Sequence, residues 1–136
     1  YPLTVDGYDL DLTFVSMGNP HAIAFIDDDV DNFPLESVGP KVENHGLFPN
    51  KVNFEITNVL TDNYVKTRVW ERGSGITMAC GTGACAVMAA AKLKNLVSDC
   101  VEVELPGGIL EVRWTGCGEL TMRGPVKTVF KGEWIG

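Results

Sequence analysis

The segment that most constrains the fold is a run of small apolar side chains at residues 84–91. Gly81 and Gly83 precede the run, and Lys92 and Lys94 follow it, where cations interact favourably with a helix dipole. This pattern predicts a helix over residues 82–95 that has no polar face for about two turns, and such a helix is buried on every side. Because its side chains are small, strands must approach it closely, so the rest of the chain has to form a sheet around it.

The remaining sequence indicates strands and one more helix. Alternating apolar and polar residues, the period of a half-buried strand, recur between turns rich in Gly, Pro, Asn and Asp. We expect strands over residues 8–16, 21–26, 52–60 and 64–70, four short strands within residues 101–130, and a surface helix over residues 35–47. No repeat, linker or low-complexity tract divides the chain. The predicted fold is α+β, a single domain over residues 1–136 in which a curled, mixed, barrel-like β-sheet wraps around one central buried helix.

Composition argues against two classes of partner. The net charge is −7, and the 11 Lys and Arg residues are scattered rather than gathered into a basic stripe, so we expect no nucleic acid. No apolar stretch approaches the roughly 20 residues that span a bilayer, so we expect no membrane segment. The start of the chain contains neither an initiator Met nor a signal peptide, so we expect the chain to begin inside something larger. Four cysteines without a secretory signal favour the reducing cytoplasm over structural disulfides.

Cys80 is the strongest candidate for chemistry. It lies between the charged pair Glu71-Arg72 and the start of the predicted helix, where free amides lower the pKa of a thiol and attract an anionic ligand. The spacing of the cysteines and histidines fits neither a zinc site nor a CxxC redox motif, so we expect no metal. Roles as a nucleophile or as a proton-transfer base remain open. A free cysteine is more often a small buried hydrophobe, but the adjacent glycines argue against that interpretation.

Three further positions accompany Cys80. His21 follows Gly-Asn-Pro at a strand start, where a polar group can face a cleft, although a lone histidine is more often structural. Glu71-Arg72 is either an exposed ion pair or part of a shared site with Cys80, in which Arg72 grips a carboxylate with two hydrogen bonds. Asn53 lies in an alternating strand, where an inward amide needs partners or a ligand.

Two motifs together carry a family resemblance. The segment ERGSGITMACGTGACA at residues 71–86 and the segment GNPH at residues 18–21, with Asn53 in Val-Asn-Phe and the pair Gly124-Pro125, resemble diaminopimelate epimerase. The similarity covers nearly the whole chain but only the C-terminal half of that enzyme. The two motifs are specific in combination, whereas Gly-Asn-Pro alone is shared with related isomerases.

The resemblance implies a cofactor-independent epimerase that interconverts LL- and meso-diaminopimelate in the synthesis of lysine and peptidoglycan precursors. In that family one cysteine thiolate removes the α-proton while a second thiol delivers a proton to the opposite face. Cys80 matches the cysteine from the C-terminal half, and His21 and Glu71 match positions that tune the thiols' pKa values. Positions that hold the substrate are matched by Asn19, Asn53, Glu71, Arg72, Gly81 and Thr82.

The main departure from the family is the second cysteine, which belongs to an N-terminal half in a motif of the Asn-Gly-x-x-x-Cys type. None of Cys85, Cys100 or Cys117 lies in such a segment. We therefore expect a chain that lacks its N-terminal domain, is inactive alone, and exposes an interdomain face through which a homodimer can form. Two alternatives stay open: another isomerase of the superfamily, proline racemase-like or aconitate isomerase-like, and a carboxylate-binding module without turnover.

Overall fold

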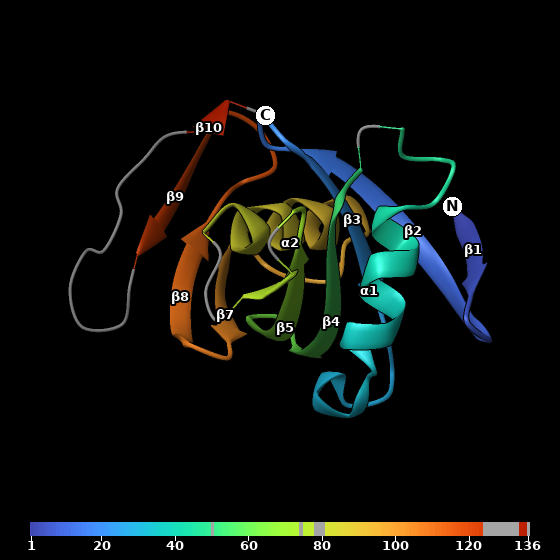
Figure 1. Cartoon of the computed structure of the whole chain (residues 1–136). Coiled ribbons are helices and arrows are strands. Elements are labelled where there is room, and N and C mark those ends of the chain that lie inside the picture. Colours follow the sequence, from blue (N-terminus) through green and yellow to red (C-terminus); the bar gives the residue numbers. More distant parts are fainter. Residues whose placement is uncertain (50, 74, 78–80, 124–133, 136) are drawn as a thin grey trace.

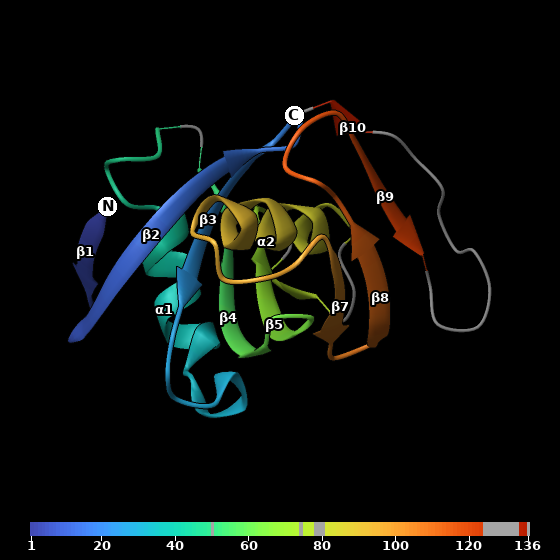
Figure 2. The same ribbon diagram turned by 180° about the vertical axis from the view of Figure 1, so that it is seen from behind.

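A mixed β-sheet curls around one long helix in this chain (Figure 1). The computed structural model describes residues 1–49, 51–73, 75–77, 81–123 and 134–135. The central helix α2 spans Gly81–Leu93, and the shorter helix α1 (Leu35–Glu43) lies on the other side of the sheet, as the opposite view in Figure 2 also shows. The expected α+β architecture is confirmed.

The strands follow one another across the sheet nearly in sequence order. The path is β1-β2-β3-β4-β5-β7-β8-β9-β10, and β6 pairs with the end of β5. The β3–β4 and β5–β7 pairs are parallel, and the others are antiparallel. Within the described residues the sheet is open, with β1 and β10 at its two ends. The strands are β1 (Pro2–Val5), β2 (Tyr8–Ser16), β3 (Pro20–Phe25), β4 (Asn53–Thr61), β5 (Tyr64–Glu71), β6 (Gly75–Thr77), β7 (Cys100–Leu105), β8 (Gly108–Arg113), β9 (Glu119–Arg123) and β10 (Trp134–Ile135).

Helix α2 is buried along almost its whole length, as its composition predicts. Every residue from Gly83 to Ala91 is buried, and side chains of β2, β3, β5, β7, β8 and β9 pack in the same core. The helix ends two residues earlier than the pattern predicts because Asn95 adopts a left-handed φ of 57°. The N–H of Leu96 then bonds to the carbonyl of Ala91, and the N–H of Asn95 bonds to that of Lys92. These two bonds form a Schellman motif, which satisfies carbonyls that the helix end leaves without partners.

Helix α1 covers the opposite face of the sheet. Its residues Leu35, Val38 and Val42 pack in a second core with β1 to β4. The predicted extension to residue 47 is wrong, because the helix ends at Glu43, where the Asn44 side chain bonds to the carbonyl of Pro40. The sheet is therefore covered by a helix on both faces in its middle, which buries polar as well as apolar residues of β4 and β5.

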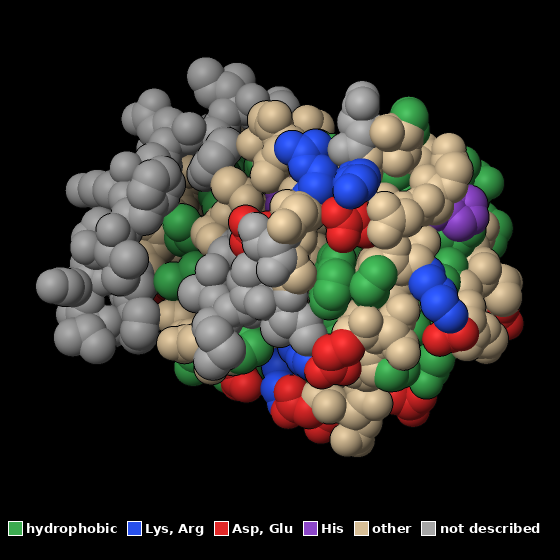
Figure 3. Space-filling model, in the orientation of Figure 1, with side chains coloured by type: hydrophobic (Ala, Val, Ile, Leu, Met, Phe, Trp, Pro, Cys, Tyr) green, Lys and Arg blue, Asp and Glu red, His purple; other side chains and the backbone are tan. Residues whose placement is uncertain are grey.

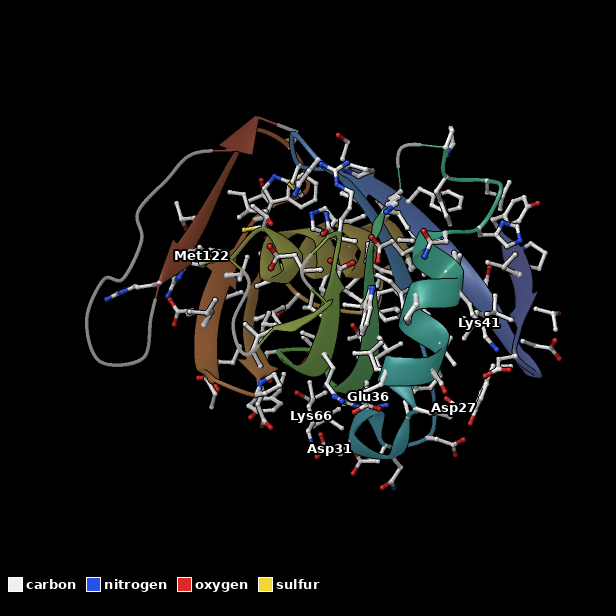
Figure 4. All side chains as sticks on the ribbon, viewed as in Figure 1. Asp27, Asp31, Glu36, Lys41, Lys66 and Met122 are labelled. Atoms are coloured by element: carbon white, nitrogen blue, oxygen red, sulfur yellow. The ribbon has the colours of Figure 1, made fainter. Side chains whose placement is uncertain are left out.

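Surface charges of both signs are interspersed on the face shown in Figure 3. Lys66, for example, lies 2.6 Å from Asp31, and the two side chains point toward each other in Figure 4. Such exposed pairs contribute little to stability, typically about 0 to 1 kcal/mol each. Among the described residues on this face, the two signs are mixed and form no basic stripe for a polyanion to follow.

Candidate active site

The sheet face that α2 covers carries a group of polar side chains at one end of β3, β4 and β5. His21 pairs in register with Asn53, Ile23 pairs with Glu55, and Glu55 also pairs with Val69. Because side chains alternate between faces along a strand, His21, Asn53 and Glu55 point to the same side as Ile23 and Val69. Those two apolar residues pack in the core that contains α2. The polar group therefore lies in the layer between the sheet and α2.

His21 is held at both ring nitrogens. Its Nδ1 is hydrogen-bonded to Oε1 of Glu55, and its Nε2 lies 3.1 Å from Oδ1 of Asn19. Asn19 is half-buried in the turn between β2 and β3, where Gly18 supplies a φ of 84° that side chains rarely adopt. The residue as a whole is only 1% exposed. The strand-start position predicted for His21 is thus correct, but its ring is buried and fixed in one orientation.

Asn53 joins the two motifs that are far apart in the sequence. Its side-chain oxygen accepts a 2.6 Å hydrogen bond from the backbone N–H of Arg72, and its side-chain nitrogen donates to the carbonyl of Pro20 at 3.1 Å. The inward amide expected at this position is present, with partners on the protein itself. A single side chain therefore fixes the Gly-Asn-Pro-His turn against the start of the Glu-Arg segment.

The turn that follows Glu71 is anchored from the other face of the sheet. Glu43, at the end of α1, accepts hydrogen bonds from the indole of Trp70 at 2.8 Å and from the backbone N–H of Gly73 at 3.1 Å. Glu71 itself is the last residue of β5 and is half-buried, in register with Gly75 of β6. Arg72 is exposed. The Glu71-Arg72 segment is thus held by a buried glutamate on one side and a buried asparagine on the other.

Gly81 and Thr82 form the first turn of α2 and are half-buried, unlike the residues that follow them. A Cβ atom on Gly81 would come within 3.0 Å of the terminal methyl of Met122 in β9, which Figure 4 labels. Amides in the first turn of a helix attract anions. Cys80 lies outside the described residues, as does the pair Gly124-Pro125, so the predictions made for them stay predictions.

Sequence reasoning missed Glu55, which is fully buried beside His21. Removal from water raises the pKa of Glu55 above its ordinary value of 4.5, and the contact with His21 opposes this rise only in part. Among the described residues, no donor or acceptor reaches the second carboxyl oxygen, Oε2. One signal was available, because Asn53 and Glu55 are two residues apart in a predicted strand and must share a face.

The described parts of the chain hold no cluster of three or more His, Cys, Asp or Glu residues suited to a metal ion. In the same parts, no helix is long and apolar enough to cross a bilayer.

Comparison with known proteins assigns the chain to a family. The sequence profile described as diaminopimelate epimerase matches residues 13–129. The chain is 48% identical to the diaminopimelate epimerase of Alkalilimnicola ehrlichii over 98% of its own length and 48% of that protein's. It is 50% identical to the diaminopimelate epimerases of Microcystis aeruginosa and Methanococcus maripaludis, over 96% of its own length and 47% of theirs.

Among solved structures, a Bacillus anthracis phenazine biosynthesis protein of the PhzF family superimposes with a TM-score of 0.55. That match covers 83% of this chain and 38% of the other at 20% identity, so it supports the fold alone. The chain spans about half the length of the curated relatives that it matches. The identity over nearly its whole length is nevertheless high, and this chain belongs to the diaminopimelate epimerase family.

Proposed function

We propose that this chain forms one half of the active site of a diaminopimelate epimerase, the enzyme that interconverts LL- and meso-diaminopimelate. One observation carries the proposal beyond sequence identity. The two motifs, although 49 residues separate them in the sequence, are joined by the side chain of Asn53, which bonds to Arg72 and to Pro20. A site assembled from separate segments requires hydrogen bonds of this kind to hold the segments in fixed positions.

In the proposed reaction Cys80 exchanges a proton with the α-carbon. As a thiolate it takes the α-proton from one stereoisomer, and a thiol on the opposite face donates a proton to the carbanion. In the reverse direction the protonated Cys80 is the donor. The α-proton of an amino acid is very weakly acidic, so the site must stabilise the developing charge with fixed donors in a dry cavity.

The remaining residues hold the substrate and adjust the thiols. We assign substrate contacts to Asn19, Asn53, Glu71, Arg72, Gly81 and Thr82, with the first amides of α2 on the α-carboxylate. We assign adjustment of the thiol pKa values to His21 and Glu71. The burial of His21 and Asn53 and their fixed orientation support these roles, because a site of this kind has to be rigid.

The second thiol comes, in this proposal, from an N-terminal domain that the chain does not include. The 136 residues alone then carry out no epimerisation, and the protein works in the cytoplasm on a free amino acid without a cofactor. The surface that meets the N-terminal domain would be exposed in the isolated chain and would favour a homodimer at high concentration.

A chimera tests the proposal. This chain would replace the matching half of the Alkalilimnicola ehrlichii relative, and exchange of the diaminopimelate α-proton with deuterated solvent would be followed by NMR. We expect exchange in the chimera, none with the 136-residue chain, and a loss of at least a hundredfold in the Cys80→Ala chimera, since a proton-transfer group typically supplies about 10²–10⁴ in rate. A folded chimera that exchanges nothing, or one that tolerates Cys80→Ala, would contradict the proposal.

The same assay separates the other functions. Exchange of proline, or isomerisation of an aconitate, without exchange of diaminopimelate would indicate a different isomerase of the superfamily. A binding module without turnover would bind diaminopimelate equally well as the Cys80→Ser variant and would gain no activity in the chimera.

A further inference from the structure

Glu55 and His21 form a buried pair whose two side chains are entirely shielded from solvent. A neutral imidazole has one nitrogen that donates a hydrogen bond and one that accepts, and the partners of the two nitrogens determine which is which. With a neutral ring the pair has two arrangements. In the first, an ionised carboxylate accepts a hydrogen bond from Nδ1–H, and in the second, a neutral carboxylic acid donates a hydrogen bond to Nδ1. In a third arrangement an imidazolium donates from both nitrogens, and its Nδ1–H bonds to an ionised carboxylate.

The partner of Nε2 favours the second arrangement over the first. Nε2 lies 3.1 Å from Oδ1 of Asn19, which is an acceptor, so Nε2 carries the hydrogen. In a neutral ring Nδ1 then has a lone pair and no hydrogen. Its bond to Oε1 of Glu55 requires a hydrogen from the glutamate.

The second oxygen of Glu55 points to the same protonation state. Oε2 is buried and has no hydrogen-bond partner among the described residues. An ionised carboxylate with a buried oxygen left unpaired is strongly unfavourable, whereas the carbonyl oxygen of a neutral acid is a weak acceptor and costs much less to leave unpaired. Burial also raises the pKa of this group, in agreement with the geometry.

We propose that Glu55 is a neutral carboxylic acid that donates to Nδ1 of His21 and thereby keeps His21 as an Nε2–H hydrogen-bond donor at the Asn19 end of the site. Glu55 is a positioning residue, since it acts only through His21. The consequence for catalysis rests on the proposed function. His21 would then stabilise negative charge on a thiolate or on the substrate through its Nε2–H, shared with Asn19, and it would not act as a base.

Two substitutions of Glu55 distinguish an acid from a carboxylate. Glu55→Gln keeps the shape and supplies an N–H to Nδ1, so it mimics the neutral acid. Glu55→Leu keeps much of the volume but leaves Nδ1 without a donor. Thr57→Val is the matched control, because Thr57 is buried two residues further along the same face of β4 and is bonded to Thr67 rather than to His21.

The first measurement uses the 136-residue chain and needs no activity. Nitrogen-15 shifts of the His21 ring and the carbon-13 shift of the Glu55 carboxyl group would be recorded at neutral pH. We expect Nε2 to be protonated and Glu55 to be neutral in the wild type, and the His21 tautomer to persist in Glu55→Gln and Thr57→Val. A protonated Nδ1 beside an ionised Glu55 overturns the proposal.

The second measurement is α-proton exchange by the chimera. Glu55→Gln should retain kcat within about threefold of the wild type, and Glu55→Leu should lower kcat by about 10- to 100-fold with little change in KM, by analogy with the loss seen when groups that orient metal-binding histidines are removed. A folded Glu55→Gln chimera that loses a hundredfold or more overturns the neutral-acid assignment. If the unsubstituted chimera is inactive, the proposed function fails, and the NMR result alone decides the state of Glu55.

Discussion

A substitution on the α1 side of the sheet tests how closely the helix and the site turn are packed. Gly39 lies in α1 directly over the ring of Trp70. A Cβ atom at this position would lie 2.5 Å from Cδ2, 2.6 Å from Cγ and 2.8 Å from Cε3 of that ring. These atoms include the root of the side chain, so no rotation of a flexible end relieves the contact. Trp70 is further fixed by its hydrogen bond to Glu43.

Two effects of Gly39→Ala oppose each other. Alanine is favoured over glycine in a helix interior by about 0.5–1 kcal/mol. Overpacking of a buried contact costs typically about 1–3 kcal/mol. The contacts here are far inside normal separations, so the second effect should win, with a net loss of about 1–2 kcal/mol in the free energy of unfolding. For a chain of this size each kcal/mol lowers Tm by about 4 °C, so we expect a Tm lower by about 4–8 °C.

Urea and thermal unfolding followed by circular dichroism would measure the change. Gly46→Ala is the control, because a Cβ atom there meets nothing within 4 Å. Gly39→Ala should be clearly less stable than both the wild type and Gly46→Ala. A Gly39→Ala variant that is as stable as the wild type would refute the argument, because it would mean that α1 can move away from Trp70 without loss.

Three other substitutions give graded expectations. Gly81→Ala should cost less stability than Gly39→Ala, under about 1 kcal/mol by thermal unfolding, because the Cβ meets only the flexible end of Met122, its terminal methyl at 3.0 Å and its sulfur at 3.6 Å, which can move aside. Asn58→Leu should lower the free energy of unfolding by about 2–4 kcal/mol in urea. The buried Asn58 side chain bonds to the backbone N–H of Val30 and to the carbonyls of Ile26 and Asp28, and leucine would leave all three groups unpaired. Asp29 accepts a hydrogen bond from the backbone N–H of Asp31, and this bond lowers the pKa of Asp29 below its ordinary value of 3.8. The ionised Asp29 therefore stabilises the fold at pH values above 3.8, and this stabilisation is lost as the pH falls below 3.8. Unfolding curves of Asp29→Asn should lack this part of the acid dependence.

The elements that the sequence predicted well are those whose signal is local. Residues 8–16 alternate in polarity, and β2 has these bounds. The small-residue run predicts α2 because a helix without a polar face has only one environment available. Cys85, which belongs to that run, is fully buried in the structure.

The pairing of strands that are distant in the sequence was harder to predict from the sequence. The parallel pairs β3–β4 and β5–β7 depend on contacts that no local pattern encodes, and β1 is only four residues long. The burial of Glu55 was missed for the same reason, because it depends on which elements cover the sheet. The alternation in β4 indicated a strand with one solvated face, but helices cover both faces in the middle of the sheet. A polar residue on such a strand is buried, and only the three-dimensional arrangement reveals that.

The turn after Glu71 illustrates how the two faces of the sheet act together. The backbone N–H groups of consecutive residues, Arg72 and Gly73, donate to side chains that belong to opposite layers: Asn53 on the α2 side and Glu43 on the α1 side. Because both acceptors are buried, the turn is fixed before any ligand binds. Fixed donors stabilise developing charge without reorganisation during the reaction. Under the proposed function, this half of the site therefore has its geometry in place, and the part that an N-terminal domain adds is the second proton-transfer group.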